Sequence, residues 1–473
     1  MKAINLKTEY LINPIGIDIE HPRLFWNCDS GVKQTAYRIV AATEGATVWD
    51  SGKVSSPSMR ADYPRSLNSR QKVIWKVLLW DENDNSGDWS EEAFFEAGLL
   101  KRSDWKAQWI TGNYNPRKNV RYPVDCFRKS FFAKKIVRAR LYITACGLYE
   151  AKINGERAGD FVFAPGSTDY RKRIQYQTCD VTALIKEGEN TLEIELADGW
   201  YRGSDGAKGR RNTYGKQTKL IAQLEMTDAA GKTAFVLSDG TWAWSSDGAV
   251  RFADLKDGEI VEADKIPSYK GQAKPVGFSA NLTAANNVPV KEMEKFPPAE
   301  LIVTPKGKKV LKFPQNLSGY ILFRLNARKG QKIHITLGEM LDGEGELTLA
   351  NIQCIHKGKR TPLQEIDYTC KEGINVYKPK FFYGGFQYAQ IDTEIPFDKN
   401  DFTAVAVYSA FEETASFGCS HPLIDQLYKN TLWSLKSNST DVPTDCPTRE
   451  RMGWTGDSEK HRVVYGRLCR LRP

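Results

Sequence analysis

The chain has 473 residues, of which 41% are hydrophobic and 26% are charged, as expected for a globular protein of about three or four domains. Five basic and no acidic residues between 460 and 473 supply much of the net charge of +9, and the excess elsewhere is too small to indicate nucleic-acid binding. No segment has the roughly 18 apolar residues of a membrane span, and the first residues lack the apolar core of a signal peptide.

Residues 1–100 are predicted to form a small β-sandwich. Apolar residues alternate with others in two stretches, and this period of two indicates half-buried strands. The alternating residues are Tyr37, Ile39, Ala41, Val73, Trp75, Val77 and Leu79. Turn signals at 50–52 and 83–87 separate the strands. Seven of the twelve tryptophans precede residue 110, which suits an aromatic-rich sandwich core.

Residues 101–285 are predicted to form a jelly-roll-like sandwich. Leu141, Ile143 and Ala145 alternate with other residues, and the next alternating stretch ends at Asn154-Gly155, a strong hairpin signal. Many short strands between such turn signals are typical of this architecture. Asp-Gly pairs in this region could bind calcium, but hairpin turns explain them more simply.

Residues 286–410 are predicted to form a third β-domain. A proline-rich stretch at 296–298 precedes it, and strands resume around Ile333, Ile335 and Leu337. After residue 411 the pattern becomes helical: Ser420 can cap a helix, Pro422 suits its first turn, and apolar residues follow on one face from Ile424 to Leu435. One amphipathic helix needs partners to bury that face, so 411–473 is interpreted as the incomplete start of a helical domain.

The strongest candidate for a catalytic segment lies between 441 and 457. Four carboxylates fall within these 17 residues, which also contain two prolines and two glycines. Glycoside cleavage needs one carboxylic acid that protonates the leaving oxygen and a second carboxylate opposite it. Composition alone favours a plainer interpretation, since acidic loops with proline and glycine are usually capped, solvated turns.

The remaining candidate sites are weak. The nine cysteines are scattered without a C-x-x-C pair, which predicts free thiols in a reducing, cytoplasmic compartment. The five histidines are dispersed and form no zinc motif. We therefore expect neither a metal nor a cofactor.

The acidic segment resembles the acid motif of the bacterial α-L-rhamnosidases of glycoside hydrolase family 78. It runs Asp445-Cys-Pro-Thr-Arg449-Glu450-Arg451-Met-Gly453-Trp454-Thr-Gly456-Asp457, and every fixed position of the family pattern matches. The resemblance extends over nearly the whole chain: 9–26 is similar to the family's fibronectin-like domain, 154–203 to its jelly-roll N domain, and 313–319 to its next β-domain, although Pro314 stands where the family more often has glycine.

The resemblance implies a mostly β, multidomain protein that continues into an (α/α)6 catalytic barrel. It implies an inverting hydrolase that releases terminal α-L-rhamnose from rhamnose-containing glycosides. The charge balance and the lack of a long apolar segment separately predict no nucleic-acid or membrane partner. Glu450 matches the general acid, and Asp445 and Asp457 match carboxylates that hold the hydroxyls of rhamnose. Arg449 and Trp454 match motif positions that line the pocket.

The resemblance also places the general base on a glutamate well downstream, in the second half of the barrel. From Glu459 to Pro473 the sequence is rich in arginine and does not align with the family. We therefore expect a chain truncated early in the barrel and inactive alone. The alternative is a non-catalytic fragment that binds carbohydrate through its β-sandwiches.

Overall fold

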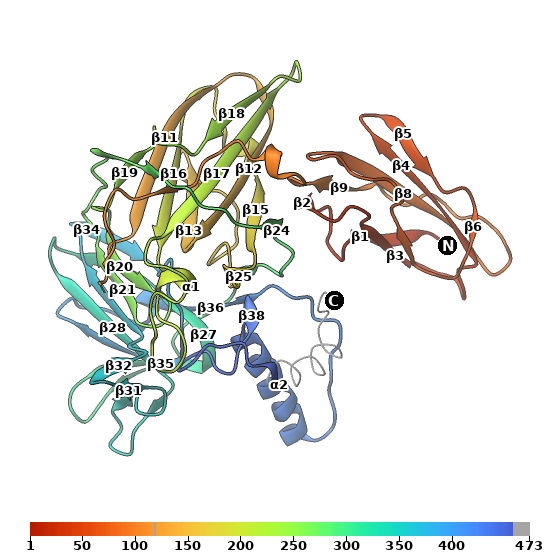
Figure 1. The fold of residues 1–473 in the computed structure, drawn as a ribbon. Helices are drawn as coiled ribbons and strands as arrows, with labels where there is room; N and C mark the ends of the chain where they lie inside the picture. Colours follow the sequence, from red (N-terminus) through yellow and green to blue (C-terminus); the bar gives the residue numbers. More distant parts are fainter. Residues whose placement is uncertain (118–119, 457–473) are drawn as a thin grey trace.

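The computed structural model describes residues 1–117 and 120–456. Strands account for 46% of the residues and helices for 7%, which confirms the predicted mostly β fold. In Figure 1 the N-terminal strands, coloured red and brown, stand apart from two further groups of sheets, and the helix α2 lies beside the last of these.

The first unit contains a three-stranded sheet, β1-β3-β7, and a six-stranded sheet in which β2-β9-β8-β4-β5 are in order and β6 pairs with β4. Their bounds are β1 Ala3–Thr8, β2 Ile15–Ile17, β3 Arg23–Cys28, β4 Ala36–Thr43, β5 Ala46–Asp50, β6 Val54–Ser55, β7 Arg60–Asp62, β8 Lys72–Trp80 and β9 Ala93–Ala97. Val73, Trp75, Val77 and Leu79 of β8 are buried while Ile74 is exposed, so one face of this strand supplies the core.

The second unit packs a seven-stranded sheet on a six-stranded one. The first has the order β23-β10-β17-β12-β15-β24, with β18 beside β17, and the second has the order β14-β13-β16-β11-β19-β22. Their bounds are β10 Ile110–Thr111, β11 Asp125–Ala133, β12 Ile136–Cys146, β13 Leu148–Ile153, β14 Glu156–Arg157, β15 Ile174–Asp180, β16 Gly188–Ala197, β17 Lys219–Asp228, β18 Thr233–Leu237, β19 Ala243–Ser245, β22 Gly271–Gln272, β23 Lys274–Pro275 and β24 Leu282–Ala284. Leu141, Ile143 and Ala145 lie in the core that the two sheets share.

The third unit is a ten-stranded sheet with the order β20-β21-β33-β28-β35-β27-β36-β25, in which β26 and β34 also pair with β27. Its strands are β20 Val250–Asp254, β21 Gly258–Glu262, β25 Val290–Phe296, β26 Glu300–Val303, β27 Lys309–Ala327, β28 Lys332–Gly338, β33 Glu365–Thr369, β34 Gly373–Tyr377, β35 Gly384–Thr393 and β36 Phe402–Ser409. Strands β20 and β21 come from within the range 101–285, so this sheet takes strands from both sides of residue 285.

Short elements complete the described chain. They are the 3-10 helices η1 Arg102–Asp104, η2 Thr182–Leu184 and η3 Lys399–Asp401, the helix α1 Gly199–Arg202, and the hairpin strands β29 Met340–Leu341, β30 Leu347–Thr348, β31 Cys354–His356, β32 Lys359–Thr361, β37 Ser439–Thr440 and β38 Val442–Pro443. The hairpins pair β29 with β30, β31 with β32, and β37 with β38.

The predicted C-terminal helix is present as α2, Pro422–Ser437. Its N-cap is His421 and not Ser420 as predicted, because the helix begins one residue later. Leu423 and Leu427 are 75% and 64% exposed, whereas Leu435 at the other end is buried in the core of the ten-stranded sheet. Trp433 packs edge-on against Phe296 of β25, with the ring centroids 5.5 Å apart. Only the last turns of α2 are therefore docked within the part of the chain that is described.

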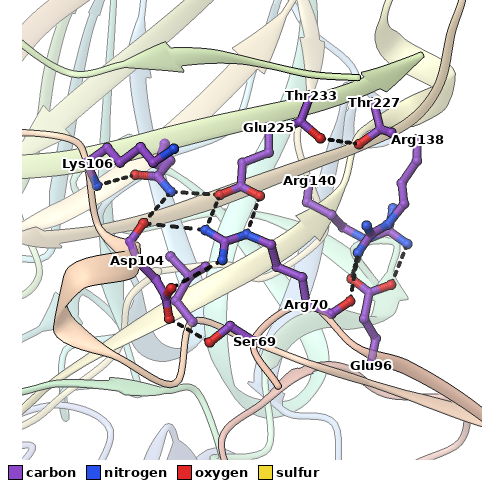
Figure 2. A network of polar contacts seen from close by, with 12 residues as sticks. Ser69, Arg70, Glu96, Asp104, Lys106, Arg138, Arg140, Glu225, Thr227 and Thr233 are labelled. Carbon is purple, nitrogen blue, oxygen red and sulfur yellow. Dashed lines mark hydrogen bonds and ion pairs between the residues drawn. The ribbon is translucent and has the colours of Figure 1, made fainter. Parts of the chain in front are cut away.

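Charged side chains join the first unit to the second, as Figure 2 shows. Glu96 of β9 is fully buried and accepts hydrogen bonds from Arg138 at 2.8 Å and from Arg140 at 2.9 Å. Arg70 donates to Glu225 at 2.6 and 2.7 Å. These contacts fix how the N-terminal sandwich meets the seven-stranded sheet.

Candidate active site

The predicted acid motif forms a loop, residues 441–456, which we call the acid loop. It starts within the β37–β38 hairpin and turns at 447–450. Asp441 opens the loop with a positive φ of 71°, and its backbone N–H donates to Ser409 Oγ at the end of β36, at 3.1 Å. The start of the loop is therefore fastened to the end of β36 in the ten-stranded sheet.

Asp441 is a structural residue that ties the acid loop to the second unit. Its carboxylate accepts hydrogen bonds from the backbone N–H of Ser167 and from the side-chain amide of Asn287. Gly166 allows this approach, since a Cβ there would lie 2.7 Å from Asp441 Oδ2. Burial raises the pKa of Asp441 to about 6, against the opposing effect of these two donors. This carboxylate consequently points between domains.

Asp445 closes the acid loop on itself. Its Oδ1 accepts the backbone N–H of Met452 at 3.0 Å, and its own N–H donates to the Met452 carbonyl at 3.1 Å. Its Oδ2 lies 3.2 Å from Cys446 Sγ. These contacts hold the two ends of the 445–452 turn together.

Glu450 lies at the turn, next to Arg449 and Trp454, two of the four other predicted site residues. Its Oε2 accepts a hydrogen bond from the indole Nε1 of Trp454 at 3.1 Å, and its Oε1 lies 3.8 Å from Arg449 Nε. The Glu450 side chain is 22% exposed, Arg449 is 49% exposed and Trp454 is 52% exposed. A carboxyl, a guanidinium and an aromatic ring thus share one solvent-facing side of the loop.

Arg451 anchors the acid loop to three segments of the third unit. Its side chain is buried, and its Nη1 donates to the backbone oxygens of Leu255 and Tyr383, the second at 2.6 Å. Its Nη2 donates to Gln364 Oε1 at 3.1 Å, and its guanidinium lies over the Tyr383 ring at 4.3 Å. Burial lowers the pKa of Arg451 from its ordinary value, although the nearby anionic groups oppose the shift.

Lys256 provides a second anchor. It is almost completely buried, and its Nζ donates to the backbone oxygens of Gly206 at 2.5 Å and Arg449 at 2.7 Å. Burial, followed by the charge of Arg451, lowers its pKa to about 8. The loop also presses on β35, because a Cβ on Gly385 would lie 2.5 Å from Thr448 Cγ2. Buried cations and a glycine hence set the position of Glu450.

The structure brings together three of the five predicted site residues, Glu450, Arg449 and Trp454. Asp445 is close in sequence, but its carboxylate is bonded within its own loop, and Asp457 lies outside the described residues. Sequence reasoning missed Asp441, Arg451 and Lys256 as positioning residues. Arg451 was visible within the motif, whereas nothing in the sequence marked Lys256.

No helix in 1–117 or 120–456 is long and apolar enough to cross a membrane. In the same residues, no three His, Cys, Asp or Glu side chains are grouped as a metal site requires.

Comparison with protein families assigns four consecutive segments to rhamnosidase domains. Residues 3–101 match the Rha78A-like N-terminal immunoglobulin domain, and 134–296 match the α-L-rhamnosidase N-terminal domain. Residues 302–408 match the bacterial α-L-rhamnosidase concanavalin-like domain, and 412–465 match the bacterial α-L-rhamnosidase six-hairpin glycosidase domain. The chain belongs to the bacterial α-L-rhamnosidases, glycoside hydrolase family 78. The predicted family is thereby confirmed.

Individual relatives agree with this family. An α-L-rhamnosidase of Formosa agariphila is 35% identical over 94% of this chain and 51% of its own length. Crystal structures of α-L-rhamnosidases from Aspergillus terreus and Dictyoglumus thermophilum are 32% and 30% identical, with TM-scores of 0.89 and 0.90. They cover 96% and 99% of this chain, which corresponds to 55% and 56% of theirs. The chain spans about half the length of the curated relatives it matches.

Proposed function

We propose that this protein acts in the hydrolysis of terminal α-L-rhamnose from rhamnosides, with Glu450 as the general acid. The observation that carries this proposal is the group formed by Glu450, Arg449 and Trp454 on the exposed side of an otherwise anchored loop. A carboxyl held in this way can protonate a glycosidic oxygen. The exposed indole of Trp454 offers a surface on which the apolar face of a sugar can pack.

The proposed reaction inverts the anomeric configuration. Glu450 donates its proton to the leaving oxygen while a water, activated by a second carboxylate, attacks from the opposite face of the sugar. The family resemblance places that general base further along the catalytic barrel. Asp445 and Asp457 remain proposed contacts to the hydroxyls of rhamnose, in addition to the role of Asp445 in closing the loop.

The test is Glu450→Gln in a catalytically active form of this protein that contains the complete barrel. Glutamine keeps the shape of the side chain and can still contact Trp454, but it cannot donate the proton. Cleavage of aryl rhamnosides with poor leaving groups should fall about 10²–10⁴-fold while rhamnose still binds. Glu91→Gln is the matched control, because it makes the same substitution at an exposed glutamate of the first unit and should keep the original turnover. Turnover like that of the unchanged protein in Glu450→Gln would exclude Glu450 as the acid.

The predicted cytoplasmic location is also a proposal. All eight cysteines in the described residues are free, which is the state expected in a reducing compartment. Expression of a tagged protein in its own host, followed by fractionation, would test this location.

A further inference from the structure

A hollow of about 780 Å³ lies where the second and third units meet. It is lined by the loop that follows α1, by the turn after β20, and by the β31–β32 hairpin. Figure 1 shows the loop after α1 descending towards that hairpin. The two meet closely, since a Cβ on Gly209 would lie 2.8 Å from Thr361 Cγ2. We call this hollow the cationic pocket, for the charges described next.

Positive charge dominates the wall of the cationic pocket. Five of its basic side chains form no ion pair within the described residues. They are Lys208, Arg210, Lys357, Lys359 and Arg360. Arg121 and Arg211 also line the pocket but are already paired, Arg211 with Asp198 at 2.5 Å, and Asp257 is the sole carboxylate among the lining residues. Asp257 is already paired with Arg121 at 2.8 Å, so it neutralises none of the five.

A second lysine-rich hollow elsewhere in the protein shows that such clusters need not be unpaired. It is lined by residues at both ends of β27 and by the turn before β28. There Lys308 pairs with Asp392 at 2.9 Å and Lys329 pairs with Asp264 at 2.8 Å. The unpaired cations of the cationic pocket repel one another, and an anionic ligand would relieve that repulsion.

The cationic pocket lies beside the acid loop. Lys256 donates one hydrogen bond to Gly206, in the loop after α1, and another to Arg449, next to Glu450. Asp257, which lines the cationic pocket, follows Lys256 directly, and Arg451 of the acid loop donates to Leu255 just before it. A short buried connection therefore joins the pocket to the residue proposed as the acid.

We propose that the cationic pocket binds a carboxylate or sulfate group on the sugar that carries the terminal rhamnose. This proposal rests on the proposed function and gives the substrate class: rhamnosides with an acidic aglycone. Lysine and arginine side chains bind such groups through charge-assisted hydrogen bonds, and arginine binds them with two parallel donors. The volume of the cationic pocket falls in the range of small-ligand sites.

Nucleic acid is the competing anionic ligand, and the lining of the pocket favours sugar. Proteins that bind single strands stack bases on aromatic side chains. The residues that line the cationic pocket include no phenylalanine, tyrosine or tryptophan. The cationic pocket can therefore hold an anionic group, but it offers no aromatic ring on which a nucleobase could stack.

The experiment measures the binding of disaccharides to the 473-residue protein by calorimetry. The probes are rhamnosyl-glucuronate, rhamnosyl-glucose 6-sulfate, neutral rhamnosyl-glucose and a glucuronate dimer without rhamnose. At about 50 mM salt the two acidic rhamnosides should bind about tenfold tighter than the neutral one. The ratio should shrink to about threefold or less at about 500 mM salt, since exposed charges are screened. A preference for glucuronate over sulfate, or the reverse, identifies the group that is bound.

The decisive variant is Lys357→Gln/Lys359→Gln/Arg360→Gln. These side chains are exposed on a hairpin, so the fold should persist while the preference for acidic rhamnosides is lost. The matched control, Lys329→Gln/Lys332→Gln, removes two lysines of the second hollow and should keep the preference.

Each remaining outcome bears on the proposal. Equal affinity for acidic and neutral rhamnosides would overturn the cationic pocket as an acidic-sugar site and leave the rhamnoside function standing. Binding of the glucuronate dimer that the triple variant loses, without binding of the neutral rhamnoside, would support the pocket and overturn the rhamnoside function. Failure of every sugar to bind would overturn both. An oligonucleotide that binds tighter than the acidic rhamnosides would overturn the sugar assignment in favour of nucleic acid.

Discussion

The two arginines that flank Glu450 differ in what surrounds them. Arg449 is half exposed and lies on the side of the loop proposed to meet the sugar. Arg451 is buried and donates to backbone oxygens of two segments that are far apart in sequence. Arginine suits such an anchor because its planar fork presents five donors in fixed directions. Adjacent residues of one type thus serve opposite purposes.

Arg451→Lys should loosen the acid loop. The ammonium group cannot reach all of the acceptors that the guanidinium satisfies, and a buried acceptor left without a partner costs about 1–3 kcal/mol. Hydrogen exchange of residues 441–456 should therefore become faster by about ten- to a hundredfold. Arg449→Lys is the matched control and should leave exchange unchanged. Equal exchange in both variants would show that Arg451 does not anchor the loop.

Asp441 should make stability depend on pH. Its pKa is raised from 3.8 to about 6 in the folded state, so the folded protein keeps a proton that the unfolded chain has lost between these values. The stabilisation is complete below about pH 3.8 and disappears as the pH rises through 6. Compared with Asp441→Asn, the unchanged protein should lose about 1–3 kcal/mol between pH 4 and 7. Urea midpoints of the two proteins measured across this range test it; parallel curves would contradict it.

At the scale of elements, strands are held together across domain boundaries by buried charges as well as by apolar contacts. Glu96 of β9 meets Arg138 and Arg140 of β12. Glu96 is fully buried and Arg140 nearly so, and such a pair stabilises chiefly because breaking it leaves a charge without its partner. The contact therefore favours one orientation of the first unit on the second.

Glu96→Ala should weaken this junction. Arg140 would remain buried with Asp180 still 2.9 Å away, so the loss of Glu96 should cost about 3 kcal/mol at most, and less if water reaches the partly exposed Arg138. Proteolysis between residues 98 and 106, where the first unit joins the second, should become faster. Glu92→Ala, which removes an exposed glutamate of the preceding turn, should cleave at the original rate. If Glu96→Ala resists the protease equally well, the ion pairs do not hold the junction.

At the scale of the whole molecule, catalysis requires a second carboxylate that can act together with Glu450. Asp441 points between domains, and Asp445 is bonded to Met452. An inverting hydrolase needs its second carboxylate roughly 6.5–9.5 Å from the acid, with a water between them. Both of these carboxylates are already held by hydrogen bonds to Ser167, Asn287 and Met452, so neither is free to activate a water.

A polypeptide consisting of residues 1–473 should therefore hydrolyse no p-nitrophenyl α-L-rhamnoside. The assay compares it with a rhamnosidase that contains the full barrel, at equal protein concentration. Turnover within about tenfold of that enzyme would show that residues 1–473 contain a base.

Local patterns were sufficient to predict the class of fold and the position of the acid loop. The alternation through Val73, Trp75, Val77 and Leu79 indicates a strand because successive side chains of a strand point to opposite faces. The helix from Pro422 follows from spacing and from the preference of proline for the first turn. Its cap was placed one residue too early, since Ser420 and His421 both precede Pro422 and local preference could not choose between them.

Long-range pairing could not be predicted in this way. Strand β21 lies among strands of the second unit in sequence but pairs with β33, more than 100 residues later, and no local signal encodes that partner. Lys256, Arg451 and Gln364 meet only because three segments converge. The two basic runs at 208–211 and 357–360 likewise line one hollow only because the fold brings them together. In the sequence alone, each has the pattern of an ordinary solvated turn. Local sequence patterns suffice to predict the family, the mostly β fold and the acid loop, because the residues that carry each of these signals are neighbours in the chain. The tertiary structure decided which charges are buried, paired or left facing a cavity, because that depends on contacts between distant segments.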